Sequence, residues 1–294
     1  MRETSWRHIG TDISGSTTIP QILTAAGLDY EVRKEPIFLG SGVQIPKKMA
    51  TVKSTGQPIG VVSDSYEIYQ NAQAFDFVGD IPGISFEKAG ETHTGMVYLI
   101  GKLPELTVLG DTFTPYVIFQ TSHNGRYNVR ATICPLRIVC QNQMAYSFKQ
   151  MRNTIDIRHS RQLPTKVAQA QALLRDTATY MAGFTNTAEE LALLKIGSKD
   201  NFYAILDKFF DSTRELTERQ ARAMEEQREF FIRCYNADDN ANFRGTAWGV
   251  VNAFSDFETH REGKKTKTAA DSRFMSVTFD PQITKLLDAI RAVA

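Results

Sequence analysis

The order of patterns along the 294-residue chain predicts an α+β fold, with an antiparallel β-meander followed by helices. Residues 116–120 and 127–133 are strand-like segments on either side of an Asn-Gly dipeptide, which favours a two-residue hairpin turn. The nearly continuous apolar run at residues 96–100 is typical of a central strand. After about residue 163, apolar residues recur every three or four positions, as in amphipathic helices. The sequence therefore predicts a β-β-β-α core with a flanking helix, followed by a helical C-terminal half.

Shorter signals place the elements that precede this hairpin. Thr18 and Pro20 predict the N-cap and first turn of a helix, and Gly27 predicts its end. A short helix is predicted at residues 71–78, where apolar side chains share one face. Turn residues and short apolar segments predict strands at 30–33, 36–39, 48–52 and 60–62, and a second hairpin at 108–113 with Gly110-Asp111 at its turn.

The second half of the chain has helical periodicity and composition. Residues 217–235 are rich in Glu, Arg, Gln and Ala, which are good helix formers. Their apolar stripe is thin, comprising Met224, Phe231 and Tyr235, and this favours self-association. Further helices are predicted from Val167, Ala170, Leu174, Thr177, Met181 and Phe184, from Phe202, Ile205, Leu206 and Phe209, and at 246–260 and 283–293, with a basic loop at 261–268.

These patterns divide the chain into two predicted regions. Residues 1–162 form a mainly antiparallel sheet domain that contains a basic hairpin-helix segment. Residues 163–294 form a helical region that is packed on the sheet domain or used in assembly.

Composition predicts a soluble cytoplasmic protein. Hydrophobic residues make up 42% and charged residues 23% of the chain, and the net charge is +1, all ordinary values for a globular protein. The sequence has neither an apolar run of about eighteen residues nor an apolar signal core, so no membrane partner and no secretion are expected. Its 3 cysteines show no CxxC pairing, which favours a reducing compartment over a disulfide framework or a zinc site.

No sequence pattern indicates catalysis. The GxSxG nucleophile motif, the phosphate-binding glycine loops and the HExxH metal motif are all missing from the sequence. Cys140 follows Arg137, which would lower the pKa of a nearby thiol, but a small buried residue is the interpretation that we favour. We therefore predict no catalytic residue, no cofactor and no metal, with a metal-dependent nuclease as the least favoured alternative.

A basic segment is the main functional signal. Between residues 123 and 166 the chain holds eight Arg or Lys and one acid, Asp156. Cations interleaved with an aromatic side chain are what single-stranded nucleic acid needs for phosphate neutralisation and base stacking. In the alternative interpretation, these cations pair with Glu215, Glu218, Glu225, Glu226 and Glu229, within the chain or from a neighbouring subunit. The candidate nucleic-acid-binding residues are Arg126, Tyr127, Arg130, Arg137, Lys149, Arg152, Arg158, His159, Arg161 and Lys166.

Several short strings also resemble a known family. They are Trp6-Arg7-His8-Ile9-Gly10-Thr11, Thr121-Ser122-His123-Asn124-Gly125, Arg137-Ile138-Val139-Cys140-Gln141-Asn142, Ile157-Arg158-His159 and Thr246-Ala247-Trp248-Gly249-Val250-Val251-Asn252-Ala253. In content and order they are similar to motifs of the phage/plasmid-like proteins classed as a domain of unknown function. Arg7 is a departure, because Trp and His are adjacent in that family. The resemblance implies a mobile-element origin, in a phage, prophage or plasmid.

A second resemblance concerns fold pattern alone. The predicted order of helix, antiparallel strands and helix between residues 71 and 166 is similar to the core of phage single-strand annealing proteins. Those proteins assemble into rings or filaments and hold single strands in a basic groove. The resulting hypothesis is a homo-oligomeric single-stranded DNA-binding protein that anneals complementary strands in phage or plasmid DNA recombination. The alternative is a non-enzymatic protein-interaction module of a mobile element, for example an inhibitor of a host defence complex.

Overall fold

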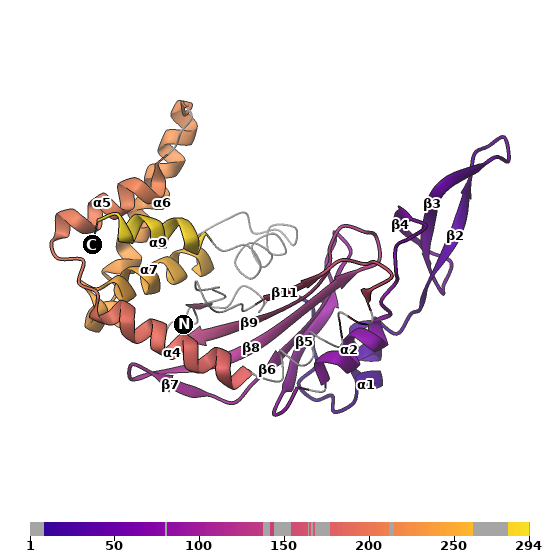
Figure 1. The fold of residues 1–294 in the computed structure, drawn as a ribbon, viewed down its shortest axis with the longest axis horizontal. Helices are drawn as coiled ribbons and strands as arrows, with labels where there is room; N and C mark the ends of the chain where they lie inside the picture. The colour runs from indigo at the N-terminus through magenta and orange to yellow at the C-terminus, as the bar shows by residue number, and fades with distance from the viewer. Residues whose placement is uncertain are drawn as a thin grey trace.

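The computed structural model describes residues 9–79, 81–137, 142–143, 154–163, 165, 167, 177–211, 215–260 and 282–293. Figure 1 shows a helical lobe, a central sheet and a narrow arm along the long axis of the molecule, and the arm is a sheet of three strands. The lobe and the arm rise on the same side of the sheet, so the molecule has the outline of a crescent.

The central sheet is antiparallel throughout. Its strands follow the order β1-β5-β6-β8-β9-β10, while β7 pairs with β8 and β11 pairs with β9. This arrangement confirms the predicted α+β fold, and the predicted central strand at 96–100 is β6, paired on both sides. The strands are β1 (Thr11–Asp12), β5 (Ser85–Glu91), β6 (Met96–Lys102), β7 (Leu106–Val108), β8 (Asp111–Ser122), β9 (Val129–Arg137), β10 (Asn142–Gln143) and β11 (Thr154–Ile157).

The predicted β8–β9 hairpin is confirmed, but its two-residue turn is wrong. The strands pair up to Gln120 and Arg130, and residues 123–128 connect them. Gly125 has a φ of 74°, whereas Asn124 lacks the positive φ that a type I′ turn also requires. Asn124 instead uses its side chain, since Oδ1 accepts a hydrogen bond from the backbone N–H of Arg126 at 3.0 Å. A wider turn results.

The β7–β8 hairpin contains the type I′ geometry that was expected elsewhere. Val108 pairs with Asp111, so the turn residues are Leu109 and Gly110, with φ values of 51° and 85°. The prediction of Gly110-Asp111 at this turn was therefore wrong by one residue. Glycine occupies the second turn position, and leucine adopts the left-handed conformation at the first.

The arm is a separate antiparallel sheet of β2 (Val32–Phe38), β3 (Gln44–Lys53) and β4 (Pro58–Ser63). The strands predicted at 30–33 and 36–39 are one strand, β2, with an irregular register against β3 between Pro36 and Phe38. Proline lacks a backbone N–H, so it is compatible with an edge strand and a local irregularity.

Most predicted helices are present. Helix α1 begins after Thr18, with Pro20 in its first turn, and Gly27 ends it with a φ of 66°. In α5, the four apolar residues used for the prediction are all buried. Asn142 and Gln143 form the short strand β10, and the predicted basic loop at 261–268 lies outside the described residues. The helices are α1 (Ile19–Ala26), α2 (Asn71–Gly79), α4 (Thr177–Leu193), α5 (Lys199–Phe210), α6 (Glu218–Tyr235), the 3₁₀ helix η1 (Asp238–Phe243), α7 (Ala247–His260) and α9 (Ile283–Arg291).

Both faces of the central sheet are buried. Val97 and Leu99 of β6 join the main hydrophobic cluster, which also includes Trp248 of α7. Tyr98, which points to the opposite face, belongs to a second cluster with Ile118 of β8. The strong burial explains why these strands read as continuous apolar runs rather than as alternating ones. Among the described residues, no helix is both long and apolar enough to span a membrane.

Candidate functional site at the junction of the arm and the sheet

The arm meets the central sheet at the β5–β6 and β8–β9 turns, a region that we call the junction. Gly60 of β4 lies so close to the hairpin turn that a Cβ atom on it would be 2.8 Å from Asn124 Cβ. Asn124 in turn donates a 2.8 Å hydrogen bond from Nδ2 to the carbonyl oxygen of Thr94. The three segments surround a cleft of about 480 Å³ whose polar lining includes Lys53, Gln57, Glu91, His93, Asn124 and Arg126.

A charged pair connects the arm to the sheet beside this cleft. Lys53 Nζ lies 3.1 Å from Glu91 Oε2 and 3.9 Å from the centre of the Tyr30 ring. The Tyr30 hydroxyl donates to the same Glu91 oxygen at 3.0 Å. Burial and the Glu91 charge raise the pKa of Tyr30, so the phenol stays protonated and continues to donate. Lys53 therefore holds the arm in place and is partly neutralised.

His123 is buried behind the hairpin turn. Its side chain is 1% exposed, and Nε2 lies 2.8 Å from Asn71 Oδ1. Asn71 donates its amide N–H to the Leu28 carbonyl oxygen, so its oxygen faces the imidazole and His123 donates from Nε2. Nδ1 is buried and has no hydrogen-bond partner among the described residues. Burial, with smaller contributions from His159 and Lys53, lowers the pKa of His123 to about 4, which keeps the ring neutral.

His159, a predicted nucleic-acid-binding residue, connects three parts of the junction. Its Nδ1 lies 2.8 Å from the Glu67 carbonyl oxygen and therefore donates, while Nε2 lies 3.4 Å from Thr121 Oγ1. The Tyr66 ring stacks on the imidazole with centroids 4.5 Å apart. Burial lowers the pKa of His159, so both histidines favour the neutral form. These contacts give the half-buried His159 a structural role.

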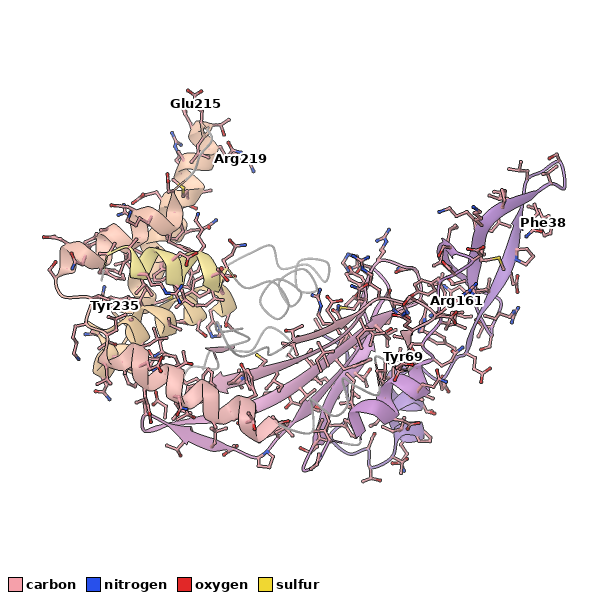
Figure 2. The ribbon with its side chains drawn as sticks, in the orientation of Figure 1. Phe38, Tyr69, Arg161, Glu215, Arg219 and Tyr235 are labelled. Atoms are coloured by element: carbon pink, nitrogen blue, oxygen red, sulfur yellow. The ribbon has the colours of Figure 1, made fainter. Side chains whose placement is uncertain are left out.

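Three of the predicted arginines are exposed at the junction. Arg126 lies in the hairpin turn before β9, and Arg158 follows β11, whose last residue Ile157 pairs with Val129 at the start of β9. Arg161 lies three residues further along, near the base of the arm in Figure 2. Within the described part of the chain, none of the three forms an ion pair. Strand pairing thus brings together cations that are more than thirty positions apart in the sequence.

Arg137 corrects one prediction. Its side chain is 2% exposed, and its guanidinium lies 2.6 Å from Asp111 Oδ2 and donates to the Asp239 carbonyl oxygen at 2.7 Å. A buried arginine engaged by these groups is not available to a phosphate, so the assignment of Arg137 to nucleic-acid binding does not fit the structure.

Arg130 and Tyr127 are also engaged within the chain. Arg130 Nε donates to Asp156 Oδ2 at 2.9 Å, so the one acid of the basic segment neutralises it. The Tyr127 hydroxyl donates to Thr94 Oγ1 at 2.8 Å, and its ring packs against the second hydrophobic cluster. The alternative interpretation of internal pairing therefore holds for Arg130 and Arg137, although the acids are not the predicted glutamates. Lys149, Arg152 and Lys166 lie outside the described residues.

The sequence did not reveal the residues that build the junction. Lys53, Glu91, Tyr66 and Asn71 come from four separate segments, and no short-range motif connects them. The best available signal was the occurrence of His123 and His159 in two of the family-like strings, which the fold brings together. No group of three or more His, Cys, Asp or Glu side chains in the described ranges is arranged to hold a metal ion.

Comparison with known proteins gives a family and no further assignment. No curated protein and no solved structure matches the chain. The family model described as a domain of unknown function (DUF932) matches residues 58–278. The matched region contains β4, the whole junction turn of β8–β9, and the helical lobe through α7. Since the match covers most of the sequence, the chain belongs to the DUF932 family.

Proposed function

We propose that this protein binds single-stranded DNA and, as a homo-oligomer, anneals complementary strands during phage or plasmid recombination. The observation that carries the proposal is the convergence of Arg126, Arg158 and Arg161 at the junction, where they are exposed and unpaired within the described residues. Exposed guanidinium groups bind phosphate with bidentate hydrogen bonds and remain charged at every physiological pH. The polar cleft beside Arg126 offers room for part of a nucleotide.

The proposed mechanism needs no hydrolysis and no cofactor. Arginines that contact phosphates hold a strand by its backbone and leave the base edges available. Counterions released from each contacted phosphate supply the binding free energy. Base pairing with a second strand then drives annealing. Three arginines per protomer give modest affinity, so repeated copies along one strand would supply the rest through effective concentration.

The test is salt-dependent binding to a single-stranded oligonucleotide without secondary structure. Arg126→Ala, Arg158→Ala and Arg161→Ala should each weaken binding and lower the slope of log K against log salt by about 0.7, the single-strand value. The loss should be similar for oligonucleotides of different sequence and equal length, because phosphate contacts carry no base information. Arg244→Ala is a matched control, since Arg244 is exposed on the helical lobe, where it donates to backbone carbonyls.

Three outcomes decide against the proposal. A triple Ala variant that is folded and binds oligonucleotide as tightly as the parent would remove the junction from DNA binding. Failure of the parent protein to bind any oligonucleotide at low salt would favour the alternative function, in which the junction arginines meet an acidic protein partner. Cleavage of the oligonucleotide on addition of a divalent metal would instead indicate a nuclease.

A further inference from the structure

The arm has no core of its own over most of its length. Its buried side chains are Val32, Thr51, Val52 and Val62, at the end next to the sheet, and no residue from 33 to 50 is buried. At the tip, large apolar side chains face solvent: Phe38 is 56%, Leu39 is 53% and Val43 is 60% exposed. A small antiparallel sheet needs a covered hydrophobic face to be stable. The apolar side chains at the tip of the arm are therefore not covered by other described residues.

At the opposite end of the molecule, a helix segment is likewise exposed to solvent along most of its length. Residues 215–227, in and before the first part of α6, are exposed except for the half-buried Met224. The first buried side chain of α6 is Phe231. Figure 2 shows Glu215 and Arg219 at the end of this helix, projecting away from the lobe. A helix of this length without tertiary contacts is only marginally stable in water. We call residues 215–227 the projecting segment.

The charges of the two surfaces are complementary. The arm, residues 32–63, carries five Lys or Arg and one acid, Glu35, which gives it a net charge of +4. The projecting segment carries four Glu and two Arg, which gives it a net charge of −2. The two surfaces lie at opposite ends of the crescent, so they do not meet within one protomer (Figure 1). They can meet only between copies.

We propose that the arm of one protomer binds the projecting segment of the next, in a head-to-tail contact between copies of this chain. This inference rests on the homo-oligomer of the proposed function. A contact between two different surfaces repeats along a chain of protomers and closes into a ring or continues as a filament. Lys47 and Lys48, both exposed on β3, provide positive charge for this contact, and Glu225 and Glu226, both exposed on α6, provide negative charge.

The side chains of the arm favour a helix as the occupant over an added strand or a nucleic acid. Pro36 in β2 and Pro58 in β4 lie on the two edge strands, where proline opposes pairing with a further strand. The exposed apolar side chains include one aromatic ring, Phe38, with Leu39 and Val43, which do not stack with bases as aromatic rings do. Aliphatic side chains instead suit a helix such as the projecting segment, which carries Leu216 and Met224.

Reversing the charges on each surface separately, and then mixing the two variants, tests this contact. The double variants Lys47→Glu/Lys48→Glu and Glu225→Lys/Glu226→Lys should each run as a 33.0 kDa monomer under conditions where the parent assembles. An equimolar mixture of the two should assemble again, because each reversed arm meets a reversed helix and each native arm meets a native helix. The matched control is Glu189→Lys/Glu190→Lys, a pair of exposed glutamates on α4, which should assemble like the parent. The measurement is mass by light scattering at micromolar concentration.

Other outcomes would overturn the contact. Parent-like mass in both double variants, a mixture that stays monomeric, or a parent that is monomeric with and without DNA would each exclude it. Lys47→Glu/Lys48→Glu that loses oligonucleotide binding at unchanged mass would assign the arm to DNA. A short oligonucleotide that spans one protomer separates this inference from the proposed function, since the monomeric variants should still bind it through the junction arginines. Near-UV circular dichroism confirms that each variant is folded.

Discussion

The central sheet and the arm have the same antiparallel pairing and opposite surroundings. Leu99, Ile118 and Phe119 in the central sheet are completely buried, whereas Phe38 and Val61 in the arm are more than half exposed. Their sequences differ accordingly, because the buried strands are nearly all apolar and the arm strands are rich in Lys and Arg. Strand pairing alone therefore does not identify the cooperative core. Side-chain burial distinguishes the central sheet, which is packed on both faces, from the arm, which is exposed.

The same substitution in each sheet should give the largest contrast. Phe119→Ala in β8 removes a ring from the main cluster and should lower the free energy of unfolding by about 3–5 kcal/mol. Phe38→Ala on the arm leaves no cavity and should change the free energy of unfolding by less than about 0.5 kcal/mol. Urea denaturation in the monomeric Glu225→Lys/Glu226→Lys background measures both. Equal losses would mean that Phe38 is buried in solution.

Two arginine substitutions in the β8–β9 hairpin should show the same contrast between a buried and an exposed side chain. Arg137→Ala leaves Asp111 without its buried partner and should lower the free energy of unfolding by about 3 kcal/mol. Arg126→Ala removes an exposed cation and should change the free energy of unfolding by less than about 0.5 kcal/mol. The order should reverse for affinity to single-stranded DNA, where only Arg126 contributes. The affinity of Arg137→Ala is measured at a concentration corrected for the unfolded fraction. If the folded variant then bound single-stranded DNA more weakly than the parent, the separation of a structural Arg137 from a DNA-binding Arg126 would be contradicted.

This pair of arginines also shows what the sequence could predict. The central strand at 96–100, the β8–β9 hairpin and the buried face of α5 were all identified, because local periodicity specifies them. Period-two alternation along β9 also implied that Arg130 and Arg137, seven positions apart, point to opposite faces and cannot line one groove. Charge alone therefore grouped two arginines that strand geometry places on opposite faces of the sheet.

Other features depended on contacts that a single sequence does not specify. The contact of Gly60 with Asn124, and that of His159 with Thr121, join segments separated by 64 and 38 positions. The two-residue hairpin turn failed because the Asn124 side chain bonds the backbone of Arg126 and the carbonyl of Thr94, a choice set by the neighbouring β5–β6 turn. Strand β11, only 4 residues long, carries too few side chains for a periodic signal.

The buried histidines should make the stability of the junction depend on pH. The pKa of His123 is lowered from 6.5 to about 4 by burial, so between these values the unfolded chain binds a proton that the folded chain does not. Stability is therefore complete above pH 6.5 and falls toward pH 4, with a slope of up to about 1.4 kcal/mol per pH unit. His159, whose pKa is also lowered, adds to this effect in the same direction.

Urea denaturation between pH 4 and 7 measures this slope. His123→Gln should flatten it, because glutamine retains a donor for Asn71 and does not titrate. The exposed His93 provides the control His93→Gln, which should keep the slope of the parent. An unchanged slope in His123→Gln would mean that the ring is accessible to protons in the folded state.

The smallest expected effect compares one glycine in each sheet. Gly125 in the β8–β9 turn and Gly56 in the β3–β4 turn have φ values of 74° and 89°, so a side chain at either position is strained. A Cβ atom on Gly125 would also lie 3.3 Å from Val62 Cγ1, whereas none of the surrounding atoms lies within 4 Å at Gly56. Gly125→Val should lower the global free energy of unfolding by about 1–2 kcal/mol, the cost of the left-handed conformation.

Gly56→Val should carry the same backbone cost, but in the arm, which we expect to open locally without unfolding the central sheet. Local opening of the arm exposes few buried apolar groups, so the strain should reduce hydrogen-exchange protection there and leave the global free energy of unfolding unchanged within about 0.5 kcal/mol. The amides to follow are those of Lys53 and Gly56, which bond the carbonyl oxygens of Gln57 and Lys53 at 2.8 Å. Equal global losses from the two glycines would show that the arm unfolds together with the central sheet. In that case its stability would come from the base of the arm, where Val52 and Val62 are buried against the junction.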